Sequence, residues 1–85
     1  MMAEQKIGEI DQYFTGISVA VLDLNEPLEV GERIKILGSS TDFCQTVTSM
    51  EIDHEEVTRA DPGQEVAIKV EDSVRVGDEV YLVEE

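Results

Sequence analysis

Apolar residues recur at every second position along most of this chain, and this alternation is what most constrains its fold. In Arg33-Ile34-Lys35-Ile36 the isoleucines share one side of the chain and the cations share the other. The segments Glu65–Val70 and Glu79–Val83 repeat the pattern. Successive side chains of a β-strand point to opposite faces, so a period of two predicts half-buried strands, whereas an amphipathic helix has a period of about 3.6. The chain is therefore predicted to be all-β.

Six strands are expected from this pattern. They are Lys6–Tyr13, Gly16–Leu24, Arg33–Leu37, Gln45–Ile52, Glu65–Val70 and Val80–Val83. The segment from Asp53 to Pro62 is the longest connection between them. Ile17 to Leu24 is apolar on both faces except at Ser18 and Asp23, which predicts a central strand that is covered on each side.

A short pattern of the form Gly-x-x-[Ile/Val]-x-aliphatic occurs four times, beginning at Gly16, Gly31, Gly63 and Gly77. Glycine adopts a positive φ without the steric cost that a β-carbon adds, so each copy predicts a turn followed by an alternating strand. The irregular spacing of the copies argues against a solenoid.

Short strands joined by glycine turns, in a chain of 85 residues, predict a small closed antiparallel Greek-key β-barrel of six to seven strands. Closure pairs every strand and leaves no sheet edge open to another chain. The chain is expected to be a single barrel domain over residues 1–85, with a core at about 6–84 and no second domain.

Acidic residues outnumber basic ones by twenty to six, which gives a net charge of −14. Nucleic-acid binding draws most of its affinity from Lys and Arg that neutralise phosphates, so a chain with this balance should be repelled at long range by RNA, DNA and anionic membranes. A solvated, solubilising surface is the simpler interpretation. With one cysteine, no signal-peptide pattern and no apolar run of about 20 residues, the expected location is the cytoplasm.

Three segments, taken in order, resemble domain II of translational GTPases of the elongation factor Tu type. They are Pro27–Ile36, Val47–His54 and Ala60–Val66. The chain is also similar to short stand-alone elongation-factor-like proteins of prokaryotes and to the C-terminal barrel of the peptidase U32 family. The segments shared with these two groups are Tyr13-Phe14, Ile17–Val21, Thr41–Phe43 and Val74–Tyr81. The resemblance implies a translation-protein barrel that works in translation or RNA modification.

The sequence also differs from these families in the regions that carry their enzymatic activity. Translational GTPases hold phosphates in a Gly-x-x-x-x-Gly-Lys-[Ser/Thr] loop, and this sequence contains no Gly-Lys pair, so no GTP binding is expected. The catalytic region of U32 peptidases lies outside a barrel of this size. We therefore expect no enzymatic activity, no catalytic residue and no cofactor.

Four residues are candidate contacts for a partner or for RNA: Arg33, Lys35, His54 and Arg59. In the resembling GTPases, domain II contacts ribosomal RNA and the aminoacyl end of tRNA, and these positions would lie near that surface. The alternative is that the cations neutralise neighbouring acids such as Glu32.

His54 and Cys44 are residue types that can bind a metal or act as a nucleophile, but their sequence neighbours do not favour either role. His54 lies among acids, but adjacent strand residues point to opposite faces, so no tetrahedral metal site is expected. Cys44 lacks a neighbouring base or cation in the sequence, so an ordinary thiol in the core or near the surface is expected rather than a nucleophile.

The expected function is a non-enzymatic module that docks to a protein or ribonucleoprotein partner. The acidic surface favours a basic protein over naked RNA. The alternative is direct binding of tRNA or rRNA through a local basic patch. The sequence leaves the oligomeric state and the identity of the partner open.

Overall fold

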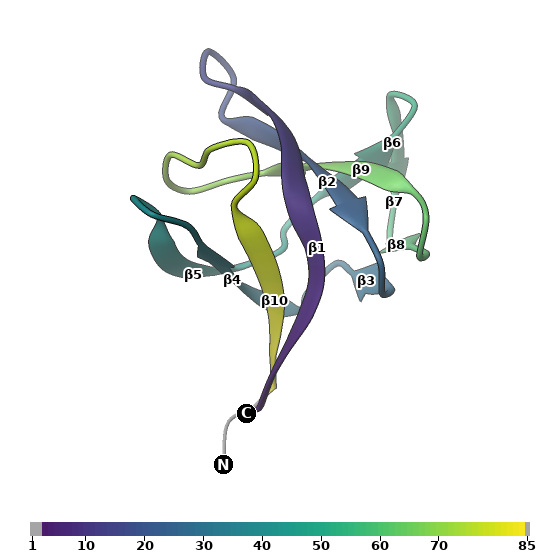
Figure 1. Ribbon diagram of the computed structural model, residues 1–85. Helices are drawn as coiled ribbons and strands as arrows, with labels where there is room; N and C mark the ends of the chain where they lie inside the picture. Colours follow the sequence, from purple (N-terminus) through teal and green to yellow (C-terminus); the bar gives the residue numbers. More distant parts are fainter. Residues whose placement is uncertain (1–2, 85) are drawn as a thin grey trace.

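The computed structural model describes residues 3–84 as ten antiparallel β-strands with no helix (Figure 1). They are β1 (Ala3–Phe14), β2 (Val19–Leu24), β3 (Leu28–Glu29), β4 (Arg33–Leu37), β5 (Asp42–Thr46), β6 (Met50–Ile52), β7 (Glu55–Val57), β8 (Arg59–Ala60), β9 (Glu65–Lys69) and β10 (Glu79–Glu84). The all-β prediction is confirmed. No helix able to cross a lipid bilayer occurs among these residues.

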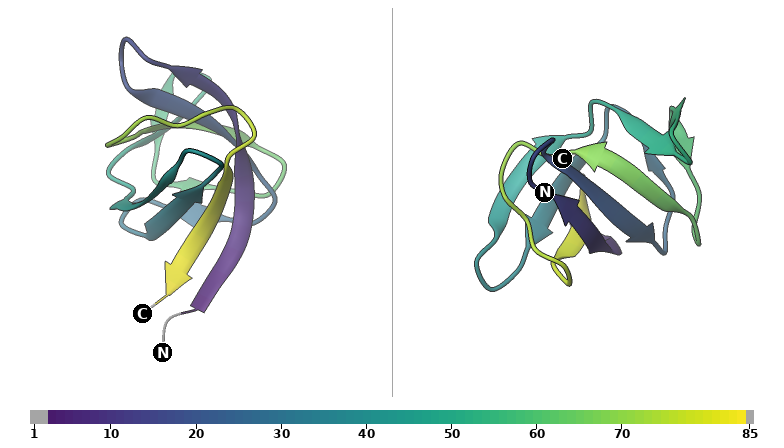
Figure 2. Two further views of the ribbon diagram at one scale, coloured as in Figure 1. Left: turned by 60° about the vertical axis from the view of Figure 1, so that its left-hand side comes forward. Right: turned by 90° about the horizontal axis from the view of Figure 1, so that it is seen from above.

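Eight of the strands form one sheet in the order β5-β4-β10-β1-β2-β9-β6-β7, and β3 pairs with β8 in a small second sheet. The long β1 lies between β10 and β2, and its register shifts between Lys6 and Gly8 and again between Ile10 and Gln12. An extra residue at such a bulge bends its strand and increases the local twist. The large sheet accordingly curls round its own inner face (Figure 2).

The inner face of the curled sheet carries the hydrophobic core. Ile34, Val66 and Val80, which the alternation predicted to face the core, are fully buried on this inner face. Leu28 of β3 and Ala60 of β8 are buried in the same cluster, so the two sheets share one core. The predicted inward faces of these strands are confirmed.

The predicted closed barrel of six or seven strands is wrong. The edge strands β5 and β7 of the large sheet do not pair with each other, and residues 3–84 form ten strands. The predicted strand Gln45–Ile52 is in fact split between β5 and β6. The chain leaves the ladder at Val47, whose N–H donates to the Glu32 carbonyl and whose carbonyl accepts from the Gly31 N–H. These bonds tie the segment to the β3–β4 turn instead of continuing the sheet.

A buried side chain links the edge strand β5 to the end of β9. Gln45 of β5 is 2% exposed, and its Nε2 donates to the Lys69 carbonyl at 2.8 Å. Its Oε1 accepts from the Glu71 N–H, also at 2.8 Å. In the sheet order, β4, β10, β1 and β2 separate β5 from β9. We call this contact the Gln45 clasp, and it joins two strands that do not pair with each other.

The other expected boundaries differ in ways that turn geometry explains. The predicted strand Gly16–Leu24 begins only at Val19, because the preceding residues form a turn in which Ser18 has a φ of 54°. Gly31, Gly63 and Gly77 have positive φ as predicted, whereas Gly16 is not among the positive-φ glycines. The long connection Asp53–Pro62 contains β7 and β8, which the sequence pattern did not predict.

Replacement of Gln45 by alanine should lower the free energy of unfolding by about 1–3 kcal/mol, because the Lys69 carbonyl and the Glu71 N–H lose their partner in a buried place. Urea unfolding followed by circular dichroism measures the change. Gln5→Ala is the matched control, since Gln5 is an exposed glutamine of β1. An equal, small effect of the two substitutions would contradict the clasp.

Candidate functional site

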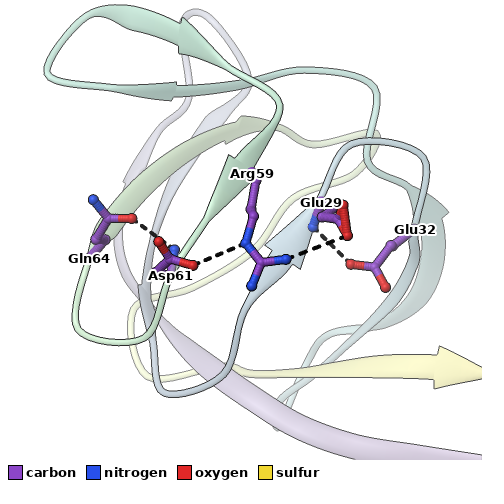
Figure 3. Close-up of polar contacts among 5 residues, drawn as sticks. All are labelled: Glu29, Glu32, Arg59, Asp61 and Gln64. Carbon is purple, nitrogen blue, oxygen red and sulfur yellow. Dashed lines mark hydrogen bonds and ion pairs between the residues drawn. The ribbon is translucent and has the colours of Figure 1, made fainter.

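The candidate contact residues lie in different parts of the fold, and ion pairs hold two of them. Lys35 Nζ lies 3.6 Å from Glu4 Oε2. Arg59 Nη1 lies 3.8 Å from Glu29 Oε1, and Arg59 Nε donates to Asp61 Oδ1 at 3.1 Å (Figure 3). These pairs agree with the alternative in which the cations neutralise neighbouring acids, although the acids differ from those expected.

The remaining two candidates also stand apart. Arg33 is exposed on β4, and His54 lies at the tip of the β6–β7 hairpin. Among the hydrogen bonds and ion pairs of residues 3–84, none joins two of the four candidates. A role for these residues as partner or RNA contacts stays a prediction.

A groove of about 430 Å³ lies on the outer face of the large sheet, away from the core. Its lining includes the half-buried Val19, Val21 and Ala67, which alternate with inward-facing core residues of β2 and β9. The β1–β2 hairpin contributes Phe14 and Ile17 to its walls. Both hairpin turns that border it, β1–β2 and β6–β7, project at the upper end of Figure 1.

The walls of the groove carry large apolar side chains that meet water. Ile17 is 64% exposed and Phe14 is 47% exposed. The sequence predicted a strand covered on each side from Ile17 onward, and the structure corrects this, because no strand of residues 3–84 covers the outer side of β2. The sequence signal for the groove was that Ile17–Leu24 is apolar on both faces. This pattern could equally have been interpreted as an apolar outer face that is open to water.

The polar lining of the groove is dominated by carboxylates. Glu51, Asp53 and Glu65 line it together with Gln12 and His54. None of the three acids belongs to an ion pair among the described residues, whose ion-paired cations are Lys6, Lys35 and Arg59. The groove therefore joins an apolar floor to a negatively charged rim.

Crowding of carboxylates perturbs one acid of this rim. A hydrogen bond with the Asp11 carboxyl, and the charge of Asp11, raise the pKa of Glu65 above its ordinary value of 4.5, with smaller contributions from desolvation and Asp23. Like charges that share a site disfavour the ionised form, so Glu65 holds its proton more tightly than an isolated glutamate does.

The hairpin tip at the groove is conformationally strained. Asp53 and His54 form a two-residue loop between the paired residues Ile52 and Glu55, and their φ angles are 51° and 65°. Positive φ at both loop positions is the geometry of a type I′ turn, which favours Asn or Asp followed by Gly. His54 occupies the position where glycine is preferred, and the strained turn places it in the groove lining.

Two further features of the described residues concern metal-ligating and nucleophilic side chains. No group of three or more His, Cys, Asp and Glu side chains there is arranged to hold a metal ion. Cys44 is exposed on the edge strand β5, opposite Lys35 in the register. A surface thiol of this kind lies within what the sequence predicted.

Replacement of His54 by glycine should raise the free energy of unfolding by about 0.5–1 kcal/mol, because glycine removes the left-handed strain at some cost in chain entropy. His54→Val should lower it, since a branched β-carbon tolerates positive φ poorly. Urea unfolding measures both. Glu56→Gly, at an exposed position of β7 without positive φ, serves as control and should be destabilising. A destabilising His54→Gly would refute the strain argument.

The raised pKa of Glu65 should make the stability of the folded chain depend on pH. The folded chain binds this proton more tightly than the unfolded chain, so the contribution of Glu65 to stability falls as the pH rises from about 4.5 through the folded pKa. Asp11→Asn should move the Glu65 pKa back toward 4.5 in a carboxyl-carbon NMR titration. Asp42→Asn is the control, and an equal effect of both would contradict the assignment.

Comparison with known proteins finds a similar segment in a protease and a similar fold in a domain of another protein. No protein-family model matches it. It is 37% identical over 81 residues to an uncharacterised protease of Methanocaldococcus jannaschii, a match that covers 94% of this chain and 20% of that protein. The chain thus spans about a fifth of the length of this relative.

Two crystal structures of one domain share the fold. They show the C-terminal domain of a Geobacillus thermoleovorans protein assigned to the U32 peptidases, one as a selenomethionine variant. Each matches with a TM-score of 0.85 at 18% identity, over 89% of this chain and over 96% and 89% of theirs. The resemblance to domain II of elongation factor Tu stays a prediction. Over nearly its whole length, the chain is similar to the C-terminal domain of U32 peptidase family proteins.

Proposed function

We propose that this chain is a non-enzymatic binding module that docks to a protein partner through the groove between the β1–β2 and β6–β7 hairpins. One observation carries the proposal: Phe14 and Ile17 expose large apolar surfaces beside an apolar floor. Grouped apolar side chains that border a concave surface are typical of interaction sites, whereas apolar residues scattered singly on a surface are ordinary.

The similar proteins favour a role for this fold as one part of a larger protein or assembly. The Methanocaldococcus jannaschii relative is named a protease and is about five times as long as the matched region. In the Geobacillus thermoleovorans protein the same fold is a C-terminal domain. A fold shared with part of a peptidase does not transfer the activity of the whole, because function resides in a site and not in a fold. On the basis of the sequence resemblance to domain II of elongation factor Tu, we propose that the partner acts in translation or RNA modification.

Electrostatics supports a protein partner over RNA. Lys35 and Arg59 already contact carboxylates, and the groove lining carries Glu51, Asp53 and Glu65. Phosphates approaching this rim would meet like charge, and RNA affinity depends on cations that can replace counterions. Direct contact with RNA is therefore an outcome of the test below and not a second proposal.

Ile17→Asn should abolish capture of a stoichiometric protein partner by the tagged chain from nuclease-treated lysate of the source organism. The asparagine removes the most exposed apolar wall of the groove without touching the core. Val76→Asn is the matched control, since Val76 is 69% exposed and does not line the groove.

Two results would contradict the proposal. One is a partner that both variants capture equally. The other is co-purified tRNA or rRNA that survives moderate salt and is released by Arg33→Glu with Lys35→Glu, because such RNA would bind the basic candidates on β4 instead of the groove.

A further inference from the structure

The floor of the groove is a row of residues in register across four strands. Gln12 of β1 lies opposite Val21 of β2, Val21 lies opposite Ala67 of β9, and Ala67 lies opposite Glu51 of β6. The row is apolar in its middle and ends in a carboxylate at β6. A side chain laid on Val21 and Ala67 would thus have a charged neighbour at one end.

A pair of acids flanks this row on the same outer face. Asp23 of β2 lies opposite Glu65 of β9, one alternate position along each strand from Val21 and Ala67. Asp11 adds a further carboxyl near Glu65 and raises its pKa. Acids therefore lie at the β6 end of the apolar row and along one of its sides, in addition to Asp53 at the hairpin tip.

No cation among residues 3–84 forms an ion pair with this rim. Lys6 contacts Glu9 and Glu79, Lys35 contacts Glu4, and Arg59 contacts Glu29 and Asp61. Lys69 lies opposite Val19 in the register and does not line the groove. A positive charge brought by a ligand would relieve the repulsion among the rim carboxylates, and the apolar floor would exclude water beside it.

We infer that the partner enters the groove with a segment that joins an apolar side chain to an Arg or Lys, the apolar group on Val21 and Ala67 and the cation against the Glu51 and Glu65 carboxylates. This inference rests on the proposed function and specifies its partner. The exposed ring of Phe14 adds a face on which an arginine can stack. Charge complementarity around an apolar centre selects such a segment over an acidic or purely apolar one.

Capped synthetic tetrapeptides test the inference directly by NMR titration of the labelled chain. The probe is Arg-Leu-Leu-Arg, and its controls are Glu-Leu-Leu-Glu, which reverses the charge, and Arg-Gly-Gly-Arg, which removes the apolar side chains. We expect shift changes at groove residues with Arg-Leu-Leu-Arg, and at least about threefold weaker binding of each control peptide.

Matched variants separate the rim from the general acidity of the chain. The double variant Glu51→Gln with Glu65→Gln should weaken binding of Arg-Leu-Leu-Arg by about three- to tenfold. The double variant Asp42→Asn with Glu71→Gln removes the same charge at exposed positions outside the groove, and it should leave binding unchanged. Equal weakening by the two double variants would overturn the inference, because the effect would then come from net charge alone.

Further outcomes distinguish this inference from the proposed function. If Glu-Leu-Leu-Glu binds as tightly as Arg-Leu-Leu-Arg and Ile17→Asn weakens both, the groove is a docking site but its requirement for a cation is refuted. If a twelve-residue oligouridine shifts the groove residues and no peptide does, the inference fails. If no peptide shifts these residues and Ile17→Asn still captures its partner, both the inference and the proposed function fail.

Discussion

The buried amide of Gln45 joins two strands that four others separate in the sheet, and its two hydrogen bonds can form only if the sheet curls. In a closed barrel a ladder of backbone hydrogen bonds would join the edge strands β5 and β7. Here one side chain supplies a donor to Lys69 and an acceptor to Glu71. Because an amide buried without partners is costly, the clasp favours the single curvature in which both bonds form.

Curvature of this kind divides the apolar residues of the sheet into two populations. Inward side chains such as Leu22 and Ile68 fill the core, while Val21 and Ala67 face outward between two projecting hairpins. The outward residues need a partner to leave water, and residues 3–84 supply none beyond the hairpin walls. The groove is thus a consequence of how the sheet curls, and the strained turn at His54 borders it.

The similarity to the Geobacillus thermoleovorans domain shows how little sequence identity this fold requires. A TM-score of 0.85 at 18% identity means that two largely different sequences specify one backbone arrangement. A pattern of inward apolar positions and turn residues suffices for that, because packing tolerates exchange among aliphatic side chains of similar volume. Outward residues are under no such constraint, and in this chain they form the charged rim and apolar floor of the groove, which carry its proposed specificity.

Local features of the sequence determined the strand class, the inward face of β4 and β9, and the positive-φ turns at Gly31 and Gly63. Alternation and glycine act over a few neighbouring residues, so they can be read without the fold. The break at Val47, the open sheet and the Gln45 clasp depend on hydrogen bonds between residues distant in the chain. Only the tertiary structure could decide them, and with them whether the outer face of β2 would be covered by the chain itself or left as a groove.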